Sequence, residues 1–231
     1  MTDLIDTTEM YLRTILELEE EEITPLRARI AERLGHSGPT VSQTIARMER
    51  DGLVVVSEDR HLELTDAGRQ LATEVMRKHR LAERLLSDVI GLEWEYVHDE
   101  ACRWEHVMSE RVERRIYELL GHPTDSPYGN PIPGLSGLGG TEAVGFAAGV
   151  QNLDHAVVDG NTGPVRIQRL AETIQVDPVL LGQLDEGGIR PGAVVTLERA
   201  GEYVVVRVEG IEGALELPSE VSAHVFVDRA N

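Results

Sequence analysis

Two segments of helical periodicity meet at a short turn, and this pattern constrains the fold more than any other feature of the sequence. Apolar residues recur at helical spacing in residues 26–34 and again in residues 39–51. Gly35 is suited to the left-handed conformation that ends a helix, and Pro39 is suited to the first helical position of the next one. The pattern therefore predicts a helix-turn-helix.

The flanking segments extend this prediction to a complete domain. Asp6 and Glu9 have the spacing of a capping box, which predicts a helix from there to about Glu21. Residues 53–56 and 61–65 are typical of two strands joined by a four-residue turn. A helix, a helix-turn-helix and a hairpin in this order predict a winged helix-turn-helix, a motif that binds DNA.

Helical periodicity continues after the hairpin and then gives way to short strands. We expect a long helix over residues 65–90, then helices over 95–107 and 109–120, the last capped by Ser109. Residues 123–149 are rich in Pro and Gly, as in a linker of partly polyproline II character. The later apolar runs predict a small, separate β-barrel; they cover residues 165–167, 194–197, 203–208, 214–217 and 224–227.

The composition is typical of a cytoplasmic globular protein. A chain of 231 residues can hold one large domain or two to three small ones. Its single cysteine excludes an internal disulfide framework, which fits a reducing compartment. The first six residues do not resemble a signal peptide, and no apolar run approaches membrane-spanning length. We therefore expect a cytoplasmic protein without a membrane partner.

The charge is unevenly distributed along the chain. A net charge of −19 argues against nucleic-acid binding if it is averaged over all residues. Residues 26–60, however, hold six arginines and five acids, whereas residues 121–231 hold six arginines and fifteen acids. The basic side chains thus gather in the predicted DNA-binding segment. The acidic remainder would suppress non-specific binding, which is mostly electrostatic; acidity for solubility alone is the alternative.

Several side chains of this segment are suited to DNA contacts. We expect Gln43 to bond to base edges, and Ser37 and Pro39 to contact thymine methyl groups at the start of the second helix. The residues suited to phosphate contacts are Arg27, Arg29, Thr40, Ser42, Arg47, Arg50 and the wing residue Arg60. For any single arginine, a solvated charged face is the alternative interpretation.

Four potential metal ligands share one face of the helix predicted over residues 95–107: His98, Cys102, Glu105 and His106. Imidazole, thiolate and carboxylate together suit transition metals. His79 and Glu83 lie one turn apart on the preceding helix. Each residue taken singly has a structural alternative, since a buried cysteine usually behaves as a small hydrophobe. A metal site beside a DNA-binding module indicates a sensor.

Two other classes of protein compete with a sensor. A metal-dependent enzyme is disfavoured because the cluster lacks a His-Glu-x-x-His motif, a glycine-rich phosphate loop and a Gly-x-Ser-x-Gly elbow. A redox or metal-storage protein that uses Cys102 is disfavoured because the chain has no second cysteine to resolve it. We therefore expect that the protein is not an enzyme.

Long motifs in a fixed order resemble the diphtheria toxin repressor/iron-dependent regulator family of metal-activated transcriptional repressors. The motifs are TTEMYLRT at 7–14, LRARIAERL at 26–34, SGPTVSQT at 37–44, MRKHRLAERLL at 76–86 and CRWEHVMS at 102–109. The resemblance is dense over residues 3–139 and extends to the remainder only in outline. Glu22 departs from the glycine that the family usually carries, and residues 140–164 follow no family pattern.

The resemblance implies a mainly α fold with β structure, in three domains. The domains are a winged helix-turn-helix at 1–65, a metal-binding and dimerisation domain at 66–140 and an SH3-like barrel at 165–231, and a linker at 141–164 precedes the barrel. A homodimer is expected, with paired dimers on DNA, and Trp104 is expected in the dimer core, or alternatively within its own domain. The third domain could instead be an interaction module that binds the Pro-rich segment 127–134.

The resemblance also implies two metal sites. The primary, activating site corresponds to Met10, Cys102, Glu105 and His106. The ancillary site corresponds to His79, Glu83 and His98, completed by Glu172 and Gln175 of the third domain. The residues that hold an anion beside the ancillary metal correspond to Arg80, Ser126 and Asn130.

The ligand chemistry of the primary site favours Fe²⁺ as the physiological metal, and we expect Fe²⁺ at both sites. A thioether and a thiolate suit a borderline metal such as Fe²⁺, Co²⁺ or Ni²⁺, and Mn²⁺ or Zn²⁺ could substitute in vitro. The family's manganese-sensing branch carries carboxylates in place of Met10 and Cys102. We expect Fe²⁺ to order the dimer for palindromic operators of iron-uptake genes, with Thr7 and Glu9 moving clear of the DNA. A manganese-responsive regulator is the alternative, and a metal-dependent enzyme is the alternative of another class.

Overall fold

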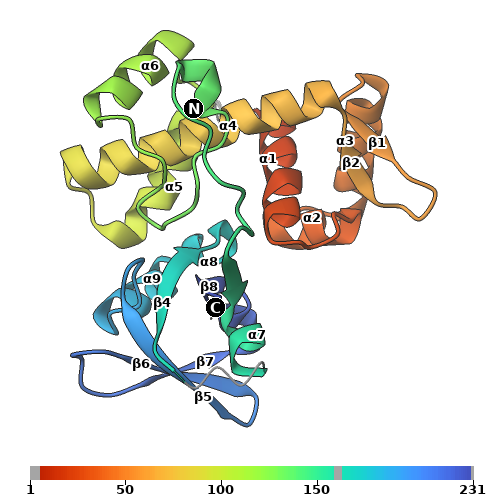
Figure 1. The fold of residues 1–231 in the computed structure, drawn as a ribbon. Coiled ribbons are helices and arrows are strands. Elements are labelled where there is room, and N and C mark those ends of the chain that lie inside the picture. Colours follow the sequence, from red (N-terminus) through yellow and green to blue (C-terminus); the bar gives the residue numbers. More distant parts are fainter. Residues whose placement is uncertain (1–5, 159–162, 230–231) are drawn as a thin grey trace. The chain divides into compact units, whose positions relative to one another are not determined.

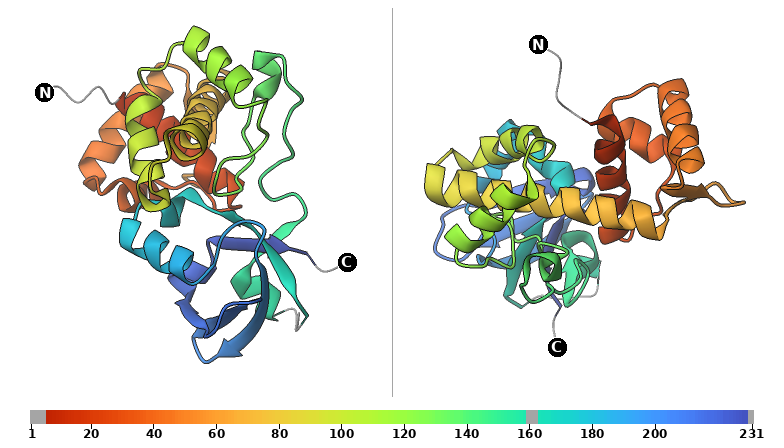
Figure 2. Two further views of the ribbon diagram at one scale, coloured as in Figure 1. Left: turned by 90° about the vertical axis from the view of Figure 1, so that its left-hand side faces the viewer. Right: turned by 90° about the horizontal axis from the view of Figure 1, so that it is seen from above.

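A computed structural model of the chain describes residues 6–158 and 163–229 (Figures 1 and 2). The chain divides into two compact units, which are described separately. One unit consists of Met1–Ala82, Ala101–Thr124 and Ile132–Gly145, and the other of Glu83–Glu100, Asp125–Pro131 and Phe146–Asn231. No helix within the described residues combines the length and apolarity needed to cross a membrane.

The first unit begins with the expected winged helix-turn-helix. Its elements are α1 (Thr7–Glu20), α2 (Arg27–Leu34), α3 (Gly38–Arg50) and the antiparallel strands β1 (Val54–Val56) and β2 (Leu62–Leu64). Figure 1 shows the β1–β2 hairpin projecting beyond α3 as the wing. Leu12, Ile15, Ile30 and Ile45 are fully buried in the core that these elements share. The prediction of this fold from the sequence is confirmed.

Local side chains explain where these helices begin and end. The Asp6 carboxylate accepts hydrogen bonds from the backbone N–H groups of Thr8 and Glu9 and so caps α1. Ser37 caps α3 in the same way, accepting from the Thr40 N–H, and Pro39 lies in the first turn. Gly35 ends α2 with φ +63°, a conformation that glycine adopts without strain.

The helical region that follows contains three helices and two short helical turns. They are α4 (Asp66–Leu85), the π-turn η1 (Leu86–Ile90), α5 (Trp94–Trp104), α6 (Glu110–Leu119) and the 3₁₀ turn η2 (Leu135–Leu138). Ser109 caps α6 as predicted, accepting from the Val112 N–H. A buried ion pair, with Arg77 Nε 2.6 Å from Glu113 Oε1, joins α4 to α6.

The second unit contains a six-stranded antiparallel sheet in the order β3-β8-β4-β5-β6-β7. The strands are β3 (Val150–Asn152), β4 (Val165–Leu170), β5 (Val194–Ala200), β6 (Tyr203–Val208), β7 (Leu215–Pro218) and β8 (Val225–Asp228). Figure 2 shows the sheet twisted into an open barrel. Four short helices accompany it: α7 (Leu153–Val158), α8 (Glu172–Gln175), α9 (Pro178–Glu186) and α10 (Ser219–Ser222).

Part of the predicted linker is structured. Residues 150–158, which the sequence assigned to the 141–164 linker, form β3 and α7, while residues 159–162 lie outside the described part of the chain. β3 pairs with β8, at the opposite end of the sequence in this unit, and only this long-range pairing makes so short a run a strand. Helices α8 and α9 were not predicted from the sequence either.

The Pro-rich segment 125–131 packs on β4. The Leu170 N–H donates to the Tyr128 carbonyl, and the Asn130 side-chain amide donates to the Leu170 carbonyl. Gly129, at φ +83°, approaches so closely that an added Cβ would lie 1.9 Å from the Gln168 carbonyl oxygen. Gln168 is the extra residue at a bulge in the β4–β8 register, so the segment fits against an irregular point of the sheet.

Candidate functional site

Helix α1 carries Met10, and two other side chains of this helix, Glu9 and Arg13, contact the segment that contains the other predicted primary ligands. His106 Nδ1 lies 2.7 Å from Glu9 Oε2. Glu9 was predicted to complete a capping box, but its carboxylate contacts His106 rather than the start of its own helix. The second contact pairs Arg13 with Glu105. Met10 itself is partly buried and packs against the core of the winged domain.

Arg13 is the centre of this polar cluster. Its Nη1 is 2.5 Å from Glu105 Oε2, 3.0 Å from His79 Nδ1 and 3.4 Å from Cys102 Sγ. Its Nε lies 3.0 Å from Glu17 Oε1, one helical turn further along α1. A single guanidinium group therefore contacts three side chains that the sequence analysis assigned to metal sites.

Glu105 is a buried carboxylate that stays ionised, although only 1% of the residue is exposed. Burial by itself would raise the pKa of Glu105, but the neighbouring Arg13 and His79 side chains outweigh this effect and hold the pKa below its usual value. The second carboxylate oxygen lies 3.2 Å from His106 Nε2. Such a carboxylate is a strong ligand for any cation that reaches it.

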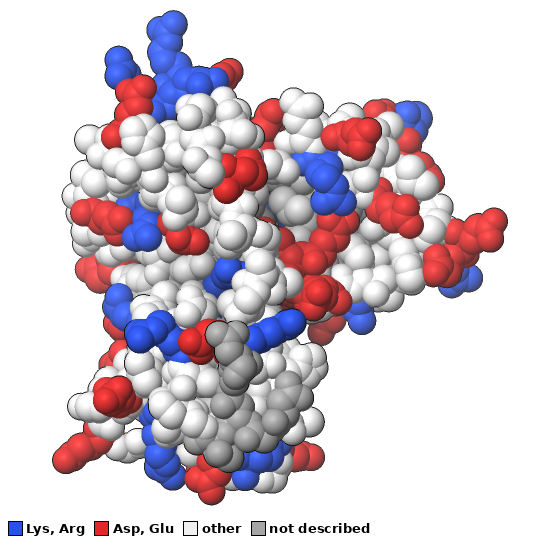
Figure 3. Space-filling model, in the orientation of Figure 1, with Lys and Arg blue, Asp and Glu red and all other residues white. Residues whose placement is uncertain are grey.

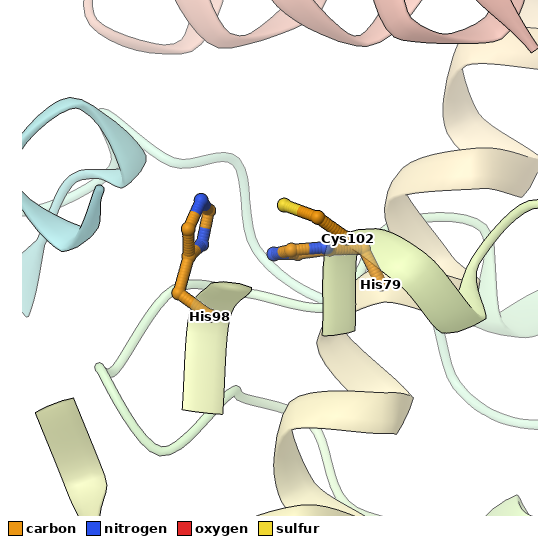
Figure 4. Close-up of side chains that lie close together, drawn as sticks. All are labelled: His79, His98 and Cys102. Atoms are coloured by element: carbon orange, nitrogen blue, oxygen red, sulfur yellow. The ribbon is translucent and has the colours of Figure 1, made fainter. Parts of the chain in front are cut away.

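Figure 4 shows His79, His98 and Cys102 converging from α4 and α5. One potential ligand atom of each side chain lies within 4.8 Å of those of the other two. Both histidines are buried, and His98 Nδ1 is 3.3 Å from Glu83 Oε1. Cys102 was expected in one metal site and the two histidines in another, whereas these three side chains form a potential ligand group of their own among the described residues.

Two predicted ligands on the third domain lie near a predicted anion ligand. Gln175 and Glu172 lie on α8 and are buried. The side-chain amides of Gln175 and Asn130 both donate to the Leu170 carbonyl. Their amide oxygens are buried and accept no hydrogen bond from the described residues. A buried acceptor without a donor is costly, and a metal ion or a water molecule would satisfy it.

The remaining predicted anion ligands have other partners. Arg80 is fully buried, and its guanidinium group lies 2.5 and 3.0 Å from the two carboxylate oxygens of Glu20. The Ser126 hydroxyl accepts a hydrogen bond from the Tyr128 N–H. An anion would therefore meet groups that are already hydrogen-bonded.

Most of the predicted DNA-contacting residues are exposed on α3 and the wing. The exposed residues are Ser37, Pro39, Thr40, Ser42, Gln43, Arg47, Arg50 and Arg60. Arg27 and Arg29 complete the set, and Arg29 donates to the Thr24 carbonyl at 2.5 Å, which holds the turn before α2. Figure 3 shows red and blue side chains together at the wing, where Glu58 and Asp59 precede Arg60. A tip of mixed charge attracts phosphate less than a purely basic one.

Two residues of α1, Arg13 and Tyr11, make contacts that were not predicted from the sequence. Arg13 contacts the ligand-bearing segment, and Tyr11 contacts the turn before α3. Arg13 lies three residues after Met10, so helical spacing could have identified it as a neighbour of the primary site. Tyr11 is fully buried, and its hydroxyl lies 2.9 Å from His36 Nδ1 in the turn before α3. No local sequence signal predicts the Tyr11–His36 contact, because it joins residues 25 positions apart.

Comparison with known families covers nearly the whole chain. Residues 3–62 match the model described as "Iron dependent repressor, N-terminal DNA binding domain", and residues 65–134 match "Iron dependent repressor, metal binding and dimerisation domain". Residues 161–229 match the FeoA domain.

The chain also resembles individual curated proteins. It is 57% identical over 231 residues to the iron-dependent repressor IdeR of Mycobacterium tuberculosis, covering 99% of this chain and 100% of that protein. It is 59% identical over 210 residues to the diphtheria toxin repressor of Corynebacterium diphtheriae, covering 91% and 92% of the two chains.

Solved structures share the same fold. A manganese-dependent transcriptional repressor in complex with manganese superposes with a TM-score of 0.83 at 27% identity, covering 97% of this chain and 100% of that one. The IdeR of T. acidophilum has a TM-score of 0.76 at 28% identity, covering 97% and 98%.

Proposed function

The chain belongs to the iron-dependent repressor family, and from this membership we propose that Fe²⁺ activates it to bind palindromic operators of iron-uptake genes. Membership makes the protein a transcriptional regulator with a DNA-binding domain and a dimerisation domain, and not an enzyme. The resemblance seen in the sequence is thereby confirmed. The choice of metal, its ligands and the operators are proposals.

One observation carries the proposal: α1 of the DNA-binding domain contacts the ligand-bearing segment through Glu9–His106 and Arg13–Glu105. Met10 lies between these two contacts on the same helix. A ligand that joins Met10 to Cys102, Glu105 and His106 would therefore act directly on a helix of the DNA-binding domain. This coupling of two sites through one movable element is what a metal-controlled repressor requires.

The primary site is proposed to consist of Met10, Cys102, Glu105 and His106. A thioether, a thiolate, a carboxylate and an imidazole fit a borderline metal such as Fe²⁺. The bound ion would supply the positive charge that holds these four side chains together. The position of Glu105 supports the assignment, because its Oε1 lies 3.2 Å from His106 Nε2 and two of the proposed ligands are therefore already adjacent.

The ancillary site is proposed to consist of His79, Glu83 and His98, with Glu172 and Gln175. The buried amide oxygen of Gln175 that lacks a donor among the described residues supports its role as a ligand. An anion held by Arg80, Ser126 and Asn130 would have to replace existing bonds of these residues, among them the Arg80–Glu20 pair. Because two ligand sets are proposed, we propose two Fe²⁺ ions per chain, with Co²⁺, Ni²⁺, Mn²⁺ or Zn²⁺ as substitutes in vitro.

On DNA, α3 is proposed as the recognition helix of each protomer. Gln43 is exposed in its middle and would bond to base edges. Exposed Arg47 and Arg50 would contact phosphates. Each dimer would present two such helices at a fixed spacing, which matches the two half-sites of a palindromic operator. Pairing of two dimers on one operator is proposed from the family resemblance alone.

A selection from random duplex DNA provides the test, because it identifies the preferred operator sequence directly. The native protein would be used with Fe²⁺ without oxygen, and the affinity for the selected duplex then measured with no metal, with Fe²⁺ and with Mn²⁺. A coupling of about 1–3 kcal/mol predicts about 5–150-fold tighter binding with the activating metal. Stronger activation by Mn²⁺ than by Fe²⁺ would favour the manganese-responsive alternative.

Met10→Ala is the decisive variant. It should keep the fold and the affinity of the metal-free protein but lose the increase in affinity caused by Fe²⁺. Val144→Ala, at an exposed site away from the proposed ligands, serves as the control and should respond to Fe²⁺ as the native protein does. Equal operator affinity of the native protein with and without either metal would refute the proposed function.

A further inference from the structure

Arg13 occupies the middle of the proposed primary site, although a guanidinium group is itself a cation. It lies on α1 and is 8% exposed. Its Nη1 contacts Glu105 Oε2 at 2.5 Å, and Nη1 and Nη2 contact Cys102 Sγ at 3.4 and 3.5 Å. Nη1 also lies 3.0 Å from His79 Nδ1. One positive group thus contacts a carboxylate, a sulfur and an imidazole at once.

The chemistry of these contacts makes Arg13 an effective substitute for a metal charge. An arginine remains protonated at every physiological pH and presents five N–H donors in a fixed plane. Glu105, at 1% exposure, requires such a partner because it is shielded from water. The arrangement is therefore electrically satisfied without any other cation.

A divalent metal bound at the primary site would bind the same atoms that Arg13 contacts. It would need the lone pairs of the Glu105 carboxylate and of the Cys102 sulfur, which are the atoms that Arg13 now contacts. Two cations that share buried ligands repel each other strongly, because little water screens them. Metal binding and the present contacts of Arg13 are therefore in competition.

We propose that Arg13 is the counter-cation of the metal-free protein, and that a divalent metal ion enters the primary site by exchange with its guanidinium group. The inference rests on the proposed function, since it takes Cys102 and Glu105 as metal ligands. Met10 and Arg13 lie three residues apart and so share a face of α1. The exchange replaces one contact of α1 by another from the same helix. The metal therefore changes how α1 is held, not whether it is held.

Glu17 gives the displaced guanidinium group a partner. Its Oε1 already lies 3.0 Å from Arg13 Nε, and the two residues are one helical turn apart. Arg13 can thus release Glu105 and Cys102 while its charge stays paired. The exchange does not require an unpaired arginine in the interior.

The experiment measures Co²⁺ binding to the full-length protein, because Co²⁺ is stable in air and its bond to a cysteine thiolate absorbs in the near ultraviolet. The growth of this band reports the site that contains Cys102. Arg13→Gln should bind Co²⁺ roughly 10- to 100-fold more tightly than the native protein, the factor for removing one charge-assisted hydrogen bond that opposes binding. Arg13→Lys should lie between the two, because it keeps the charge but not the planar fork.

Arg77→Gln is the matched control. Arg77 is also a poorly exposed arginine of this unit, and it pairs with Glu113 and the Gly134 carbonyl but with none of the proposed ligands. It should leave the Co²⁺ affinity within about two-fold of the native value, since it alters stability alone. Thermal denaturation adds a second readout: metal-free Arg13→Gln should melt below the native protein, and Co²⁺ should narrow this gap.

Folded Arg13→Gln and Arg13→Lys proteins that bind Co²⁺ no more tightly than the native protein would overturn the exchange. An Arg13→Gln protein that folds only in the presence of Co²⁺ would support it, and one that folds in neither condition leaves Arg13→Lys to decide. Glu105→Gln separates this question from the proposed function. Loss of the Co²⁺–thiolate absorption band in Glu105→Gln would support Glu105 as a ligand of the primary site. Absence of this band in the native protein would refute the primary site itself.

Discussion

The hydroxyl of Tyr11 lies 2.9 Å from Nδ1 of His36, and this contact joins α1 to the turn from which α3 begins. Tyr11 directly follows Met10 in the sequence and is fully buried. A displacement of α1 is therefore transmitted to the start of the proposed recognition helix by a hydrogen bond as well as by packing. The contact supplies a physical route from the proposed primary metal site to the DNA interface.

Tyr11→Phe removes this hydrogen bond with little change in shape. We expect the free energy of unfolding to fall by about 1 kcal/mol, the usual net value of one hydrogen bond. We also expect a weaker effect of metal on operator affinity. Chemical denaturation and operator titration measure the two effects. Tyr203→Phe, at a side chain that is 45% exposed, should change neither, and a fully stable Tyr11→Phe protein would show that the hydroxyl contributes nothing.

The stability of the metal-free protein should depend on pH through Glu105. Burial raises the pKa of Glu105, but Arg13 and His79 lower this pKa by a larger amount, so that its net shift is downward. The folded protein therefore binds a proton at this site less readily than the unfolded chain does. The stabilisation is therefore present above the ordinary carboxyl pKa of about 4.3 and is lost as the pH falls through the lower, folded-state value.

Glu105→Gln isolates this contribution. The difference in unfolding free energy between the native protein and this variant should be largest near neutral pH and should shrink below about pH 4.3, where the unfolded carboxyl becomes protonated. Glu198→Gln is the control, because its exposed side chain pairs with Arg207 at 3.7 Å and is not buried as Glu105 is. A constant difference between native protein and Glu105→Gln from pH 7 to pH 3 would contradict the assigned direction of the pKa shift.

Glu22→Gly should stabilise the protein by about 1 kcal/mol. Glu22 is exposed and has φ +58°, in the left-handed region where a side chain costs about 1–2 kcal/mol and glycine does not. The greater freedom of glycine in the unfolded chain offsets part of this gain. Glu32→Gly, at an exposed position inside α2, should have the opposite effect by about 1 kcal/mol. Thermal denaturation of the two variants compares the signs directly.

Gly129→Ala should loosen the segment 125–131 from β4. Gly129 has φ +83°, and its new Cβ would lie 1.9 Å from the Gln168 carbonyl oxygen, which the backbone cannot accommodate without moving. Gly139→Ala is a matched control, because it has φ +84° but no atom within 4 Å of the added Cβ. Both variants bear backbone strain, so faster amide exchange at Leu170 only in Gly129→Ala would identify the steric effect.

Arg47→Ala should weaken operator binding about equally for all sequences and reduce the slope of log affinity against log salt by about 1, since one phosphate contact is lost. Arg115→Ala removes another exposed arginine, on α6, and should leave the slope unchanged. Gln43→Ala should instead relax the preference at one base pair. An unchanged salt slope in Arg47→Ala would remove this residue from the interface.

The sequence predicted the elements whose ends are defined locally. The caps at Asp6, Ser37 and Ser109 and the left-handed Gly35 depend on neighbouring residues, so α1, α3 and α6 could be anticipated. The strand β3 could not, because it depends on pairing with β8, more than 70 residues away. Helical spacing places Arg13 beside Met10, but its pairing with Glu105 could not be predicted for the same reason, since the two residues are 92 positions apart.

The site itself was predictable as a set of residue types but not as a geometry. The spacing of Cys102, Glu105 and His106 indicates ligands on one helical face. It does not show that Glu105 would bind Arg13, or that Cys102 would lie beside His79 and His98. A buried charged side chain can pair with any of several groups that the fold brings near it, and its partner depends on their relative positions in three dimensions. The spacing of residues along the sequence does not contain these positions.

The segment 125–131 supplies hydrogen-bond partners for both backbone groups of Leu170, through the Tyr128 carbonyl and the Asn130 amide. A fragment limited to residues 146–229 would keep the Gln175 amide on the Leu170 carbonyl but would leave the Leu170 N–H of β4 without its partner. Unpaired strand backbone is a template for pairing with other chains. The isolated barrel should therefore self-associate, and any cut that separates it from the helical region for biochemical study should be placed before residue 125 and not after the Pro-rich stretch.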